Sequence, residues 1–269
     1  MTVQLFVLLF LLGAVTGVLA GLLGIGGGMV MVPFLVIAMQ SLGFPGNELI
    51  KIAIATSLTT ILFTSLSSVR AHHRRRGVRW DLVATLAPGI IIGTLVATRF
   101  VRDADSRWLT LFFSAFMAWS AWRMVWPAPR KGGETGEIAI GKTKLMSVGG
   151  VIGILSAMLG AGGGFLTIPF LTRNGVAIKE AVGTSAAIGF SIAAAGAIGY
   201  AISGPRIPLA GPVVGYIYLP ALLAIALASV ITAPYGASLA HRLPVAVMRR
   251  IFAGLLALLA LYMGWRAWR

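Results

Sequence analysis

The chain has 269 residues, of which 58% are hydrophobic and 11% charged, and its formal net charge is +15. An ordinary soluble domain has about 25% charged residues, so this composition and a mean hydropathy of +0.93 predict an integral membrane protein. Cysteine is absent, which excludes disulfides, thiolate metal sites and cysteine nucleophiles.

Apolar segments long enough to cross a bilayer, about 20 residues each, recur along the whole chain. The sequence predicts an all-α membrane protein with about eight transmembrane helices. In chain order they cover residues 3–23 (continuing towards 44), 49–69, 82–100, 108–125, 145–171, 177–202, 209–239 and 245–263. A polar linker at 127–144 separates two sets of four.

Two glycine clusters interrupt the first segment of each set. They are Gly24, Gly26, Gly27 and Gly28, and then Gly160, Gly162, Gly163 and Gly164. An apolar run and a Pro-Phe-Leu triplet follow each cluster, beginning at Pro33 and Pro169. Because glycine costs about 1 kcal/mol relative to alanine inside a helix, we expect broken helices at both clusters. Paired breaks of this kind indicate a substrate site.

The clusters belong to a longer internal repeat, with an offset of 136 residues around them and 128 or 139 further along. The repeat predicts a first unit at 1–126 and a second at 145–269. Four crossings per unit would make the halves parallel, whereas an odd number would make them inverted. The apolar region from 3 to 44 exceeds one crossing, so a re-entrant segment or a fifth crossing is left open.

The glycine clusters allow three interpretations. A dinucleotide fingerprint fails, because its sixth position is Met29 or Phe165 instead of glycine. Close helix packing fits the spacing of Gly24 and Gly28 but does not require three consecutive glycines. We therefore favour broken helices whose free backbone N–H groups face an anion.

Hydroxyl and lysine side chains recur near the clusters in the segment that follows. Thr56 and Ser57 match Thr184 and Ser185, and these hydroxyls either bond back to their own helix or coordinate a ligand. Lys51 and Lys179 precede them by five residues, and either extend to the membrane surface or attract an anion.

The seven acidic residues all lie in loops or at segment ends. A cation pathway normally needs a carboxylate within the membrane, so a neutral or anionic substrate is favoured. No metal-ligand spacing or catalytic arrangement is present, and neither an enzyme nor a cofactor is expected.

The doubled Gly-x-Gly-Gly-Gly with Pro-Phe-Leu, followed by Thr-Ser in the next helix, resembles the sulfite exporter TauE/SafE family of bacterial membrane permeases. The resemblance covers nearly the whole chain. It implies transport of a small sulfur-containing anion such as sulfite, sulfoacetate or another organosulfonate. The substrate-binding residues that it and the repeat suggest are Gly26, Gly27, Gly28, Pro33, Lys51, Thr56, Ser57, Gly162, Gly163, Gly164, Pro169, Lys179, Thr184 and Ser185.

The sequence thus predicts a secondary transporter that works by alternating access, with a passive anion channel as the alternative. The expected location is the cytoplasmic (inner) membrane, and the expected partners are the bilayer and a small anion. Nucleic acid is not expected, and a homodimer is left open. With eight crossings, the side with both termini has 13 Lys and Arg residues and the other side nine, which predicts cytoplasmic termini.

Overall fold

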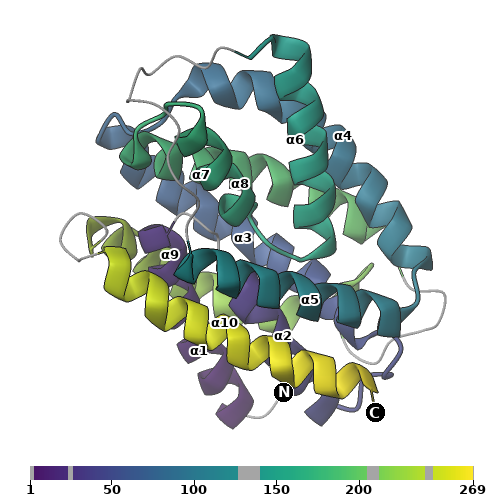
Figure 1. Ribbon diagram of the computed structural model, residues 1–269. Helices are drawn as coiled ribbons and strands as arrows, with labels where there is room; N and C mark the ends of the chain where they lie inside the picture. The colour runs from purple at the N-terminus through teal and green to yellow at the C-terminus, as the bar shows by residue number, and fades with distance from the viewer. Residues whose placement is uncertain (1–2, 24–26, 127–139, 205–211, 240–244, 269) are drawn as a thin grey trace.

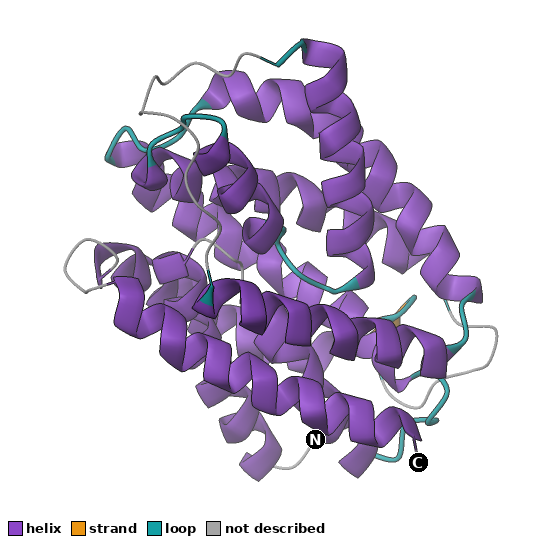
Figure 2. Ribbon diagram, viewed as in Figure 1, coloured by secondary structure: helices purple, strands orange, loops and turns teal. Residues whose placement is uncertain are grey.

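The computed structural model describes residues 3–23, 27–126, 140–204, 212–239 and 245–268. This part of the chain forms a bundle of ten helices and one two-stranded hairpin (Figure 2). The first half contains α1 (Val3–Leu23), α2 (Gly28–Ser41), α3 (Leu49–Arg74), α4 (Trp80–Asp103) and α5 (Ser106–Val125). The second half contains α6 (Lys142–Met158), α7 (Gly164–Arg173), α8 (Ile178–Ile202), β1 (Val213–Val214), β2 (Ile217–Tyr218), α9 (Leu219–Leu239) and α10 (Val245–Trp268).

The all-α class is confirmed, but eight crossings in two sets of four are not. The described residues contain five helices in each half, because each glycine cluster ends one helix and begins a second, shorter one. Of these described helices, six are long and apolar enough to cross a membrane, namely α1, α3, α4, α8, α9 and α10. The chain is a multi-pass membrane protein.

The central pair of helices, α3 and α8, runs antiparallel. Leu58 near the start of α3 lies against Gly196 near the end of α8, and His72 at the end of α3 lies beside Gly183 near the start of α8. The α3 segment from Leu49 to Ile61 is almost completely buried. This pair therefore forms the core on which the other helices pack.

The remaining contacts come in matched pairs. Helix α9 runs parallel to α3, and α4 runs parallel to α8. Small residues of α1 pack on α9, and small residues of α6 pack on α4, where glycine allows two backbones to approach closely. The contacts are Gly13 with Ile225, Gly17 with Ser229, Gly149 with Leu86, and Gly153 with Ile90. The two sets correspond residue by residue at the offsets of 136 and 139 found in the sequence.

Helices α5 and α10 lie side by side and antiparallel in front of this core (Figure 1). The Ser114 hydroxyl donates a hydrogen bond to the carbonyl oxygen of Ala260 at 2.7 Å. The Arg107 guanidinium lies 5.9 Å from the ring centroid of Trp268. The start of one helix therefore lies at the end of the other.

The bundle has two ends, which we name by their contents. At the β-hairpin end, the strand pair lies beside the start of α3 and the end of α4. At the arginine end, the last turn of α3 and its connection to α4 carry His72, His73, Arg74, Arg75 and Arg76. Basic residues in the last turn of α3 also complement the negative end of its helix dipole.

Candidate functional site

At the first break, the described chain resumes at Gly27 with left-handed backbone. Gly27 has φ of 68° and caps α2, whose first residue is Gly28. A side chain is strained in this conformation, and a Cβ at Gly27 would also crowd the carbonyl of Thr16. Helix α2 then packs mainly on α3, where Gly28 lies beside Ile61. Gly26 lies outside the described residues.

The second break has the same form. Gly160 and Gly163 have φ of 59° and 73°, and Gly163 caps α7, which begins at Gly164. Residues 160–164 are all buried. The first N–H groups of α7 have no partner within the helix, as at any helix N-terminus. The prediction that the two clusters interrupt helices agrees with these boundaries.

The two breaks meet in space. A Cβ at Gly28 would overlap the carbonyl oxygen of Gly160 and would lie 3.0 Å from the Cα of Ala161. The Ser57 hydroxyl donates a hydrogen bond to the Gly160 carbonyl at 2.9 Å, and it lies 3.5 Å from the Gly28 carbonyl oxygen. Ser57 therefore connects the first Thr-Ser motif to both breaks.

The two threonines of the motifs make matching bonds across the halves. Thr56 in α3 accepts a hydrogen bond from the backbone N–H of Tyr218 at 3.0 Å, just before α9. Thr184 in α8 accepts one from the N–H of Arg79 at 3.0 Å, just before α4. Neither of these hydrogen bonds is made to a carbonyl group of the threonine's own helix. In this structure both hydroxyls hold the N-terminus of a helix from the other half.

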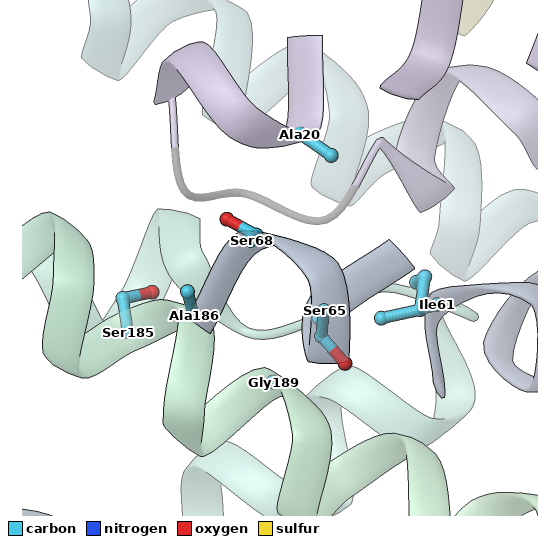
Figure 3. Close-up of a pocket in the computed structure, with 8 residues that line it drawn as sticks. Ala20, Ile61, Ser65, Ser68, Ser185, Ala186 and Gly189 are labelled. Carbon is cyan, nitrogen blue, oxygen red and sulfur yellow. The ribbon is translucent and has the colours of Figure 1, made fainter. Parts of the chain in front are cut away.

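A pocket lies between α3 and α8, on the arginine side of the Ser57 bridge. It is a partly open hollow whose empty space, including the part open to the outside, is about 230 Å³, and three serines contribute to its wall. Figure 3 shows Ser185 and Ser68 on its wall with Ala186 between them. The lining residues are Ala20, Ile61, Ser65, Ser68, Gly162, Ser185, Ala186 and Gly189. The pocket thus brings Ser185 of the second motif to Gly162 of the second break.

The prolines and lysines lie elsewhere. Pro33 and Pro169 are each the sixth residue of their short helix, where the missing N–H removes one helical hydrogen bond. Pro33 is buried and Pro169 is exposed, and neither lines the pocket. Lys179 is exposed at the start of α8.

Lys51 belongs to a buried polar cluster at the β-hairpin end. Its ammonium donates a hydrogen bond to the carbonyl oxygen of Arg102 at 2.9 Å and lies 3.8 Å from the Glu48 carboxylate. Burial raises the pKa of Tyr216 in the hairpin, and the Glu48 carboxylate raises it further, so this phenol stays neutral. Ser65, about 14 residues beyond Lys51, is roughly 21 Å away along the helix. Lys51 therefore connects α3 to the end of α4 at the β-hairpin end and does not reach the pocket.

The sequence reasoning missed Ser65 and Ser68. The internal repeat indicates only residues that have the same counterpart in the other half. Ser65 and Ser68 correspond to Ala193 and Gly196. A helical signal was available, because Ser57, Ser65 and Ser68 are spaced for one face of α3. The pocket wall is therefore a continuation of the Ser57 face towards the arginine end.

Comparison with known proteins identifies relatives over almost the whole chain. The family model described as "Sulfite exporter TauE/SafE" matches residues 9–263. A probable membrane transporter protein of Haemophilus influenzae is 37% identical over 262 residues, covering 96% of this chain and 98% of the relative.

More distant relatives have similar descriptions. A probable membrane transporter protein of Methanocaldococcus jannaschii is 27% identical, with 95% of this chain and 94% of the relative aligned. The probable membrane transporter protein YunE of Bacillus subtilis is 30% identical over 74% of this chain and 79% of its own. No solved structure gives a significant match.

Proposed function

Because the chain belongs to the sulfite exporter TauE/SafE family, we propose that this membrane transporter moves a small sulfur-containing anion by alternating access. The substrate class comprises sulfite, sulfoacetate and other organosulfonates. The family and the relatives are described as transporters and not as enzymes.

The meeting of the two breaks is the observation that carries this proposal. Gly28 and Gly160 touch midway along the bundle, and the Ser57 hydroxyl joins them. Three serines, two glycines, two alanines and one isoleucine line the adjacent pocket, and no carboxylate is among its described lining residues. Such a site favours an anion over a cation, because N–H and O–H groups donate to oxyanions and a helix N-terminus adds positive potential.

The matched contacts support an inverted relationship between the halves. Helices α3 and α8 correspond in the sequence repeat and pack antiparallel, as do α5 and α10. A two-fold axis that relates antiparallel helices is perpendicular to them, and for membrane-crossing helices it lies in the membrane plane. We infer two inverted five-helix repeats, in which motion of one against the other exposes the site to each side in turn.

In this arrangement α1 with α2, and α6 with α7, form hairpins that each return to the end from which they enter. Helices α3, α4, α5, α8, α9 and α10 then cross. In this assignment α1, which is long and apolar enough to cross by itself, is one arm of a hairpin, and α5, which is not among the six described helices that are long and apolar enough, crosses beside α10. The start of α1 and the end of α10 accordingly lie at the β-hairpin end of the bundle.

Basic residues support an orientation in the membrane. Among residues with described side chains, the arginine end has Arg70, Arg74, Arg75, Arg76, Arg79, Arg123, Lys142, Lys144, Arg173, Lys179 and Arg250. The β-hairpin end has Lys51, Arg99, Arg102, Arg107 and Arg266. Because cytoplasmic loops are enriched in Lys and Arg, we propose that the arginine end faces the cytoplasm. This reverses the orientation expected from eight crossings, which placed both termini in the cytoplasm.

Flux into proteoliposomes tests the proposed function. Vesicles that contain the purified protein should take up labelled sulfite at a rate that saturates with concentration. The variants Gly27→Leu and Gly163→Leu should each abolish uptake, because both residues have left-handed backbone at the breaks. The matched control is Gly254→Leu, since no atom lies within 4 Å of a Cβ at that position in α10. Full activity in both break variants would contradict the site, and no anion flux in the wild-type protein would contradict the function.

A further inference from the structure

Among the described residues, the pocket lies on one side of the central helix pair, and the corresponding place on the other side is filled by a side chain. The offset of 128 residues matches Ala186 with Leu58, and Ser68 with Gly196. Ala186 and Ser68 both line the pocket. At the corresponding place, the side chain of Leu58 lies so close to Gly196 that a Cβ there would overlap it. The two halves therefore differ at these two positions. Ala186 and Ser68 leave a space between the helices, whereas Leu58 fills the corresponding space beside Gly196.

The hydroxyl of Ser68 is the unexplained group in this pocket. The residue is 2% exposed, and its oxygen has no hydrogen-bond partner among the described residues. Leaving a buried hydroxyl unpaired is unfavourable. The neighbouring Ser65 hydroxyl instead donates to the carbonyl oxygen of Leu62 at 3.2 Å. Ser68 is therefore the serine of α3 whose hydroxyl hydrogen has no acceptor among the described residues.

The surroundings of Ser68 indicate the charge of its partner. Ser185 and the backbone of Gly162 share the pocket with it, and Gly162 directly precedes the cap of the ten-residue helix α7. The positive end of that helix dipole favours an anion. No cationic side chain is among the described lining residues, so neutral donors would have to hold the ligand.

We propose that Ser68 is a substrate-binding residue, whose hydroxyl donates a hydrogen bond to a single small oxyanion held in this pocket. One chain then has one such site, built asymmetrically from nearly symmetric halves. Ser65 and Ser185 contribute to the wall, and the nearby N-terminus of α7 adds positive potential. This inference rests on the proposed function, since it identifies how the transporter holds its anion.

Sulfite binding to the purified full-length protein in detergent tests the assignment, measured by the rise in the unfolding temperature as the choline salt of sulfite is titrated. Ser68→Ala should weaken half-saturation about tenfold, the size expected for losing one hydrogen bond to a charged ligand. Ser120→Ala is the matched control, because Ser120 is also buried and also lacks a partner among the described residues, but lies in α5. It should bind as the wild-type protein does.

A second variant keeps the test decisive if Ser68→Ala is unstable. Ala186→Leu reproduces at the pocket the residue that fills the corresponding place, and it should remove sulfite stabilisation while leaving the unliganded protein folded. Unchanged half-saturation in Ser68→Ala or in Ala186→Leu would overturn the proposal, while sulfite flux in the wild-type protein would leave the proposed function standing. Stabilisation by sodium chloride that choline sulfite does not reproduce would indicate a cation site and would also overturn it.

Discussion

The hydroxyl of Ser57 lies 2.9 Å from the carbonyl oxygen of Gly160, although the two residues are 103 positions apart in the chain. Ser57 belongs to the Thr-Ser motif of the first half, and Gly160 opens the glycine break of the second. Both are buried. This bond makes the two breaks one structural unit and connects the predicted motifs more directly than the repeat alone suggested.

Ser57→Ala should lower the free energy of unfolding by about 1–3 kcal/mol, because the buried Gly160 carbonyl loses its donor. Thermal unfolding in detergent measures the change. Ser67→Ala provides the control: Ser67 also donates to a carbonyl of another helix, that of Val230 at 3.0 Å, but at an exposed position. Equal losses in the two variants would show that the Ser57 bond has no special weight.

Thr56→Val and Thr184→Val should destabilise the protein to a similar extent, each by about 1–3 kcal/mol, since each leaves one backbone N–H without its acceptor. The affected groups are the N–H of Tyr218 and that of Arg79. The corresponding threonine-to-serine variants retain the hydroxyl and should stay near wild-type stability. Strong destabilisation by only one of the two valine variants would contradict the matched roles of the threonines.

Gly28→Ala should cost about 1–3 kcal/mol by overpacking and should impair transport, because the added methyl group would overlap the Gly160 carbonyl. Gly254→Ala is the control within a helix, since its Cβ meets open space. That variant should be neutral or more stable by up to about 1 kcal/mol. Unfolding temperature and sulfite flux are measured on both, and wild-type behaviour of Gly28→Ala would refute the close approach of the breaks.

The proposed orientation is testable because the chain has no cysteine. Gly46 and Gly141 precede α3 and α6 at opposite ends of the bundle, and a Cβ at either position meets no atom within 4 Å. A membrane-impermeant maleimide added to intact cells should label Gly46→Cys and leave Gly141→Cys unlabelled until the cells are opened. Labelling of Gly141→Cys alone would reverse the orientation.

The sequence predicted the features that recur, and the structure added those that do not. Paired glycine clusters predicted two broken helices, and the family resemblance is confirmed by a model match from residue 9 to 263. Eight crossings are not confirmed, since the described residues form ten helices of which six are long and apolar enough to cross. Hydropathy does not distinguish one long apolar segment from two short helices separated by a turn. The residues that contact the ligand remain a prediction.

There is a physical reason why the sequence did not predict the Ser68 side of the pocket. The internal repeat does not indicate Ser68, because its counterpart in the other half is Gly196, which has no hydroxyl group. The space beside it depends on Ala186 being smaller than Leu58, which becomes visible only when α3 and α8 are placed together. The bond between Ser57 and Gly160 likewise needs the packing of the two halves, since nothing in either local sequence indicates the partner.

Counterflow of labelled sulfite in proteoliposomes tests the central claim most directly, because alternating access requires a substrate site that faces one side at a time. Vesicles preloaded with unlabelled sulfite should accumulate the labelled anion transiently, at a rate that saturates with external concentration. A passive channel lets both sides equilibrate at once. Flux that is linear in concentration and unaffected by preloading, with current carried by sulfite alone, would contradict the account.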